Sequence, residues 1–305
     1  MPHDGHDHHH DHAPASFGRA FAIGIGLNLA YVLAEVGYGV AANSLALLAD
    51  AGHNAGDVLG LGAAWLASWL AQRRPSWSYT YGLRGSSILA ALGNAIVLML
   101  VTGGIAWEAI HRLFAPEPAA GSTIMIVAAI GIVVNGVTAW LFMSGRKGDL
   151  NVHGAFLHMA ADALVSVGTV AAGAVILWTG WLWIDPAVSL VVSGVIVAGT
   201  WGLLRDSTRL AMAGVPPGID RAKVEGFLGA LPGVRSVHDV HIWAMSTTET
   251  ALTAHLVRED GETDDALLHH ACEGLRDRFG IGHATLQVET GDPAYPCRLA
   301  PDHVV

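Results

Sequence analysis

The chain has 305 residues, of which 52% are hydrophobic and only 14% are charged. A soluble globular domain usually carries about 25% charged residues, so this composition excludes an ordinary soluble protein. The formal net charge of −10 argues against a nucleic-acid partner, which would need a basic surface. Charged residues are scarce between residues 20 and 200 and frequent after residue 205, which predicts a membrane domain followed by a soluble domain.

Residues 1–16 contain six His and three Asp but too few apolar residues to form a core. We predict that this segment is a disordered cytoplasmic tail that binds metal weakly. The alternatives are an expression tag and a merely solvated tail.

Six apolar stretches follow, each long enough to cross a hydrocarbon core with about 20 residues. They cover residues 17–41, 44–71, 85–110, 122–144, 152–178 and 184–204. Basic residues cluster after the second, fourth and sixth stretches, and the positive-inside rule therefore places both termini in the cytoplasm. We predict a six-helix transmembrane domain over residues 17–213, located in a bacterial inner (plasma) membrane.

The second stretch carries ionisable side chains where lipid tails would surround it. Asp50, His53 and Asp57 are spaced i, i+3, i+7 and therefore share one helix face. The fifth stretch repeats the His-x-x-x-Asp spacing with His158 and Asp162. Two helices that each offer a His and an Asp one turn apart can supply a tetrahedral set of two nitrogens and two oxygens, which suits Zn²⁺. Asp50 either lines the ion pathway or belongs to a hydrogen-bond network.

The breaker cluster Gly214-Val-Pro-Pro-Gly218 predicts a boundary between the membrane domain and a soluble domain over residues 214–291. The hydrophobic patterns there predict the order α-β-β-α-β, over residues 220–231, 235–245, 250–258, 263–279 and 283–290. Strand alternation places His241 on the face opposite to His238. Residues 292–305 contain three prolines and are expected to form a loose tail.

Four motifs in this order resemble those of the cation diffusion facilitator family of divalent-metal/proton antiporters. They are Ser44-Leu-Ala-Leu-Leu-Ala-Asp50-Ala-Gly-His53-Asn-Ala-Gly-Asp57, Tyr79-Thr-Tyr-Gly82, His153-Gly-Ala-Phe-Leu-His158-Met-Ala-Ala-Asp162 and Val237-His-Asp-Val-His-Ile-Trp243. The resemblance covers nearly the whole chain. It implies a homodimer of six-helix membrane domains with ferredoxin-like cytoplasmic domains in contact.

The resemblance also implies two sets of metal ligands. The transport site would be formed by His53, Asp57, His158 and Asp162, and a His in the second span resembles the zinc-preferring branch. A regulatory Zn²⁺ in the cytoplasmic domain would be held by His238, His255, His269 and Glu289, with His283 as an additional candidate. The loop over residues 71–84 lacks His and acidic residues, so the loop metal site of some members is not expected here. No organic cofactor is implied.

These observations favour a secondary transporter that exports Zn²⁺ in exchange for protons. An intramembrane metalloenzyme would carry His-Glu-x-x-His, which the sequence lacks, so an enzyme is not expected. The alternatives are a membrane metal sensor, which would need no ligands in mid-membrane, and a passive divalent-cation channel, in which tight coordination would slow release. The expected partners are a second copy of the chain, the lipid bilayer and protons.

Overall fold

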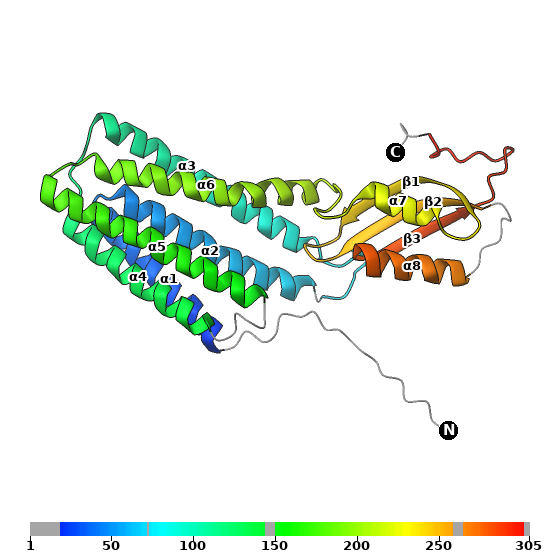
Figure 1. Cartoon of the computed structure of the whole chain (residues 1–305), viewed down its shortest axis with the longest axis horizontal. Helices are drawn as coiled ribbons and strands as arrows, with labels where there is room; N and C mark the ends of the chain where they lie inside the picture. The colour runs from blue at the N-terminus through cyan, green and yellow to red at the C-terminus, as the bar shows by residue number, and fades with distance from the viewer. Residues whose placement is uncertain (1–18, 72, 144–149, 259–264, 302–305) are drawn as a thin grey trace, which may run out of the picture. The chain divides into compact units, whose positions relative to one another are not determined.

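The computed structural model describes residues 19–71, 73–143, 150–258 and 265–301 (Figure 1). The predicted His-rich tail, residues 1–16, lies outside the described residues. Six long helices occupy the first two thirds of the chain. Their bounds are α1 Arg19–Ala41, α2 Leu45–Ala71, α3 Ser86–Phe114, α4 Gly121–Met143, α5 Leu150–Thr179 and α6 Ile184–Ala211.

Four helical segments are long and apolar enough to cross a membrane, judged over the described residues. They are Ser86–Phe114, Gly121–Leu141, Met159–Thr179 and Ile184–Ala211, and a shorter apolar helix covers Ile25–Ala41. Helix α2, which carries the ionisable residues, is not among the four. The count of six spans therefore stays a prediction. Helix α6 continues to Ala211, well beyond the predicted end of the sixth stretch at residue 204.

The described residues divide into two compact units, one within Met1–Val58 and Gly103–Ser193 and the other within Leu59–Thr102 and Gly194–Val305. In the first unit, α4 packs along α5 and against α1. A Cβ added to Gly121 would lie 2.9 Å from the carbonyl oxygen of Gly173, and the reverse contact is equally short. Close approach on small residues is a common way for membrane helices to pack.

The start of α2 is held by a side chain from the first turn of α6. The Ser44 hydroxyl donates to Asp185 at 2.5 Å, and the Leu45 N–H donates to the other Asp185 oxygen at 2.8 Å. Ser44 also accepts from the Leu47 N–H at 3.2 Å, as an N-cap residue does. Asp185 is 2% exposed. The first N–H groups of a helix have no intrahelical partner, so this carboxylate satisfies donors that would otherwise be buried and unpaired.

The second unit contains the sheet domain, which we define as Arg221–Glu289. Its elements are α7 Arg221–Gly229, β1 Val234–Ala244, β2 Thr250–Arg258, α8 Asp265–Phe279 and β3 Ile281–Glu289. This is the predicted order, and the Asp220 side chain caps α7 by accepting from the Ala222 and Lys223 N–H groups. The three-stranded sheet has the order β1-β2-β3, with β1 antiparallel and β3 parallel to β2. Apolar side chains of α7, α8 and the strands form one buried core.

A β-bulge in β1 overturns the prediction for His241. His238 pairs with His255 and His241 pairs with Thr253, with a register shift between the two pairs. Residues 253 and 255 lie on the same face of β2, so His238 and His241 also share a face. The extra residue is accommodated at Asp239, whose φ is 50°. Asp tolerates this left-handed conformation better than most residues, and bulges shift the alternation by one.

Also within the second unit, the start of α3 contacts the turn between β1 and β2. The Arg84 guanidinium donates to Glu249 at 2.5 Å, and the Thr247 N–H donates to Ser87 at 3.0 Å. Both charged side chains are about two fifths exposed, at 39% and 42%. Ion pairs this exposed contribute little stability by themselves. The contact therefore orients the turn between β1 and β2 against the start of α3 more than it stabilises the fold.

We expect Asp185→Ala to destabilise the protein, because it leaves the first N–H groups of α2 buried without an acceptor. The expected loss is roughly 1.5–3 kcal/mol, the range for hydrogen bonds to a charged group. Thermal unfolding in detergent should show a clear drop in the apparent melting temperature. The matched control is Asp206→Ala, a half-exposed carboxylate on the same helix that pairs with Arg205, which should shift the melting temperature little. Equal shifts for both variants would contradict the capping role.

Candidate metal centres

The first candidate site lies in the first unit, where α2 and α5 carry their ionisable residues. His53 Nε2 is 3.2 Å from Asp162 Oδ1 and 3.8 Å from Asp57 Oδ2. The side chain of Asp162 is 3% exposed, while those of His53 and Asp57 are 21% and 25% exposed. Each residue offers one ligand atom, and these atoms all lie within 4.8 Å of one another. Asp162 is therefore the most buried of these three candidate ligands.

These separations suit a small tetrahedral cation. Zinc bonds of about 2.0–2.2 Å to nitrogen and oxygen hold neighbouring ligand atoms about 3.3–3.6 Å apart in a tetrahedron. The distances from His53 to the two carboxylates, 3.2 and 3.8 Å, lie just below and just above that range. His158 lies on α5 one turn before Asp162, but its side chain is outside the described residues. A fourth ligand at that position stays a prediction.

Asp50 lies in a second, deeper group of polar side chains. It is fully buried at 0% exposure, as is Glu35 on α1. Its electrostatic neighbours include Glu35, Ser166, His53 and Asp162. Glu35 accepts a hydrogen bond from the Asn54 amide at 2.9 Å. Asp50 is thus outside the cluster around His53 but adjacent to it, and Glu35 of α1 adds a second buried carboxylate to this group.

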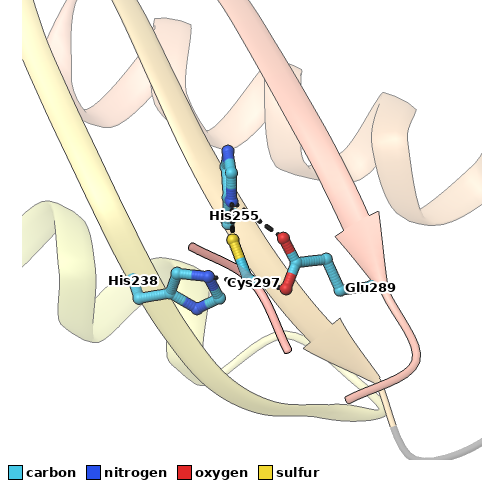
Figure 2. A group of neighbouring side chains, drawn as sticks. All are labelled: His238, His255, Glu289 and Cys297. Carbon is cyan, nitrogen blue, oxygen red and sulfur yellow. Dashed lines mark hydrogen bonds and ion pairs between the residues drawn. The ribbon is translucent and has the colours of Figure 1, made fainter. Parts of the chain in front are cut away.

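The second candidate site is a cluster of four side chains in the second unit (Figure 2). His238, His255 and Glu289 come from β1, β2 and β3, and Cys297 comes from the segment that follows β3. His255 Nδ1 is 2.8 Å from Glu289 Oε1 and 3.4 Å from Cys297 Sγ, and His238 Nε2 is 3.5 Å from Glu289 Oε2. Two imidazoles, a carboxylate and a thiol at these separations form a donor set that zinc accepts.

Asp239, the residue at the β1 bulge, supports this cluster from outside it. Its carboxylate lies 3.5 Å from His255 Nε2 and 2.8 Å from His241 Nε2. A metal-binding imidazole commonly donates its other N–H to a carboxylate, which fixes the tautomer and the ring orientation. With Nδ1 facing Glu289 and Cys297 and Nε2 facing the Asp239 carboxylate, His255 is oriented for such a contact.

The electrostatics of Cys297 reflect its acidic surroundings. A hydrogen bond with the Leu299 backbone lowers the pKa of the thiol, but desolvation and the nearby carboxylates of Glu289 and Asp239 raise it more. The net effect is a pKa above the ordinary value for cysteine. A cation among these carboxylates would oppose this effect by stabilising the thiolate.

Two other residues predicted for this site do not join the cluster. His269 on α8 is 74% exposed and lies 3.3 Å from Glu273 on the same helix. His283, near the start of β3, contacts the ring of Tyr81 edge-on, with ring centroids 5.5 Å apart. The structure thus brings three of the five predicted residues together, namely His238, His255 and Glu289.

Sequence reasoning missed Cys297 and Asp239. Cys297 lies in a segment without hydrophobic periodicity, which we predicted to be a loose tail, so no pattern placed its side chain. For Asp239, the sequence shows only a polar residue between His238 and Val240, and nothing in it predicts the contact with His255. The one available signal for Cys297 was its residue type, since a thiolate is a strong zinc ligand.

Comparison with known proteins assigns both parts of the chain to one family. The family profile described as "Cation efflux transmembrane domain" matches residues 21–210, and the profile described as "Cation efflux protein, cytoplasmic domain" matches residues 216–291.

Three relatives align over almost the whole chain. The metal cation efflux system protein CzcD of Cupriavidus metallidurans is 36% identical over 297 residues, which cover 97% of this chain and 92% of CzcD. The zinc transporter ZitB of Escherichia coli is 37% identical over 287 residues, 93% of this chain and 91% of ZitB. A cadmium, cobalt and zinc/H(+)-K(+) antiporter of Bacillus velezensis is 35% identical over 288 residues, 93% of this chain and 92% of that protein.

We expect Asp239→Asn to weaken zinc binding by the sheet domain. Asn tolerates the left-handed backbone at this position but removes the charge that orients His255, and losing such a partner typically lowers metal affinity 10–100-fold. Competition with a chromophoric chelator would measure the affinity in full-length protein whose membrane site is disabled by Asp57→Asn and Asp162→Asn. The control Asp277→Asn, at an exposed helix position, should leave it unchanged. An unchanged affinity in Asp239→Asn would remove Asp239 from the site.

Proposed function

The chain belongs to the cation efflux family, also called the cation diffusion facilitators, whose members are transporters and not enzymes, and we propose that it exports Zn²⁺ from the cytoplasm in exchange for protons. The ion would bind between α2 and α5, held by His53, Asp57, His158 and Asp162. The family assignment covers both the membrane part and the sheet domain.

The observation that carries the proposal is the cluster of His53, Asp57 and Asp162 on two apolar helices. Ionisable side chains are costly inside a membrane and mark ion pathways when they gather there. The donor atoms lie within 4.8 Å of one another, which a single small cation can bridge. Mixed imidazole and carboxylate ligands suit Zn²⁺, although related divalent ions can use them too. The names of two relatives, a zinc transporter and a cadmium, cobalt and zinc/H(+)-K(+) antiporter, both include this cation.

Exchange for protons follows from the chemistry of these ligands. A metal binds neutral imidazole and ionised carboxylate, so metal binding releases protons from the site and protonation favours metal release. An imidazole ordinarily titrates near neutral pH, where this competition is effective. One relative is named as an antiporter that exchanges metal for protons and potassium, which supports a counter-ion of this kind.

The remaining features of the proposal concern assembly and location. We propose six spans over residues 17–213 with both termini in the cytoplasm, in a bacterial inner membrane. The sheet domain would be a ferredoxin-like module over residues 214–291 that pairs with a second copy and binds a regulatory Zn²⁺. The His-rich residues 1–16 would collect metal, and residues 292–305 would follow the domain as its tail.

We expect Zn²⁺ uptake into proteoliposomes to depend on an acidic interior, because protons leaving the vesicle would drive zinc in. Collapsing the pH gradient should slow uptake. Asp162→Asn should slow it by more than about tenfold, because even the loss of a residue that only supports a ligand can cost 10–100-fold in metal affinity. The matched control is Asp206→Asn, a half-exposed carboxylate near the end of α6, which should transport like the parent.

The same measurement separates the alternatives. A passive channel would admit Zn²⁺ down its own gradient at a rate that does not change when the pH gradient is collapsed. A membrane metal sensor would bind zinc and show no uptake. Either result would contradict proton-coupled export.

We expect His53→Asp to transport Cd²⁺ as well as Zn²⁺, because a carboxylate would replace the imidazole that we propose makes the site selective for Zn²⁺. The measurement is uptake of both ions by the parent and the variant in the same vesicle preparation. His111→Asp, which changes an exposed His near the end of α3, is the matched control and should not gain Cd²⁺ uptake. Cd²⁺ uptake equal in the parent and in His53→Asp would show that His53 does not set the preference.

A further inference from the structure

The fourth side chain of the cluster in Figure 2 comes from outside the sheet domain. Cys297 lies in the C-terminal segment, which we define as residues 290–301 and which has turns but no helix or strand. Among the described residues, the backbone hydrogen bonds of this segment stay inside it, such as Tyr295 N–H to Asp292 and Ala300 N–H to Cys297. Most of its side chains are exposed, and Cys297 is half-buried. A segment held this lightly needs a specific contact to stay on the sheet.

Cys297 makes that contact with the face of the sheet that carries His238, His255 and Glu289. Its Sγ is 3.4 Å from His255 Nδ1, the nitrogen that also faces Glu289. The free cysteine Cys272 on α8 offers a contrast, because it is exposed and is not part of any metal-binding cluster among the described residues. The thiol of Cys297 is therefore placed among two imidazoles and a carboxylate, and the four ligand atoms lie within 4.8 Å of one another, close enough for one small cation to bridge them.

We propose that Cys297 is the fourth ligand of a metal site in the sheet domain, so that binding of a thiophilic divalent cation fastens the C-terminal segment across the sheet. The other three ligands would be His238, His255 and Glu289. The inference rests on the metal binding that we proposed for the sheet domain and does not depend on transport. It assigns to the C-terminal segment the role of a clasp that closes when metal is present.

The sulfur ligand also makes the two sites of the chain chemically different. The membrane site offers nitrogen and oxygen atoms, whereas this site adds a soft thiolate, which favours Zn²⁺ and softer ions over Mg²⁺, Ca²⁺ and Mn²⁺. Closing the segment costs little entropy because the loop between Glu289 and Cys297 is short. A sheet-domain site of this kind responds to thiophilic ions in particular.

The first test measures the reactivity of both cysteines in the full-length protein in detergent. Alkylation by iodoacetamide, with and without Zn²⁺, is followed for each cysteine by mass spectrometry. At a free zinc concentration ten times the dissociation constant, about one site in eleven is empty, so alkylation of Cys297 should slow roughly tenfold. Cys272 in the same molecules is the internal control and should react at an unchanged rate. Equal rates for Cys297 with and without zinc would overturn the proposal.

A second test identifies the ligand directly and uses Cd²⁺ as the probe. Binding to a thiolate produces a sulfur-to-cadmium charge-transfer absorption in the ultraviolet. It should appear in the parent and in Cys272→Ala and be absent in Cys297→Ala. It should persist in Asp57→Asn/Asp162→Asn, which lacks the membrane site, so failure of the transport proposal would leave this result intact. A band that survives in Cys297→Ala would exclude Cys297 as the ligand.

A third test addresses the fastening of the segment. Trypsin can cleave after Arg298, which is exposed and adjacent to Cys297. Zinc at ten times the dissociation constant should slow this cleavage roughly tenfold in the parent if only the open segment is cut. Zinc should have no effect in Cys297→Ser, the closest variant in shape. Equal protection of parent and variant would show that the segment is not held through its thiol.

Discussion

The main constraint on the first unit is the contact between an imidazole and a carboxylate on two apolar helices. His53 Nε2 lies 3.2 Å from Asp162 Oδ1, and Asp57 is on the same face of α2. Such groups are costly in a bilayer unless they are paired, hydrated or bound to a cation. The site therefore favours positive charge, and a divalent metal and protons are alternative ways to supply it. That exchange is the physical basis of the proposed transport.

The ligands depend on contacts that hold their helices. Asp185 caps the start of α2, and Gly121 and Gly173 allow α4 and α5 to approach closely. A ligand set on packed helices keeps its geometry better than one on loops, which metal selectivity requires. The candidate ligands of the sheet domain are held differently, because three come from neighbouring strands and one comes from a separate segment. We propose that the first site holds an ion in transit and that an ion at the second site changes the position of the C-terminal segment.

Much of the fold could be predicted because the helical and strand periods are visible in the sequence. His53 and Asp57 share a face through the helical repeat alone, and residues 283–288 of β3 alternate as expected between exposed and half-buried positions. The face of His241 could not be predicted, because the bulge at Asp239 depends on one residue adopting a positive φ. Nor could Cys297 or Asp185, whose contacts join parts of the chain distant in sequence. Periodicity reports local structure, whereas these side chains act through tertiary contacts.

X-ray absorption at the zinc edge would test the central claim, that α2 and α5 close four side chains around one ion. The protein would carry His255→Ala and Cys297→Ala, so that the sheet domain no longer competes for zinc. The account predicts four nitrogen and oxygen ligands at about 2.0–2.2 Å, with imidazole scattering that weakens by half in His158→Ala. A shell containing sulfur, a six-coordinate shell of oxygen, or a spectrum that His158→Ala leaves unchanged would contradict it.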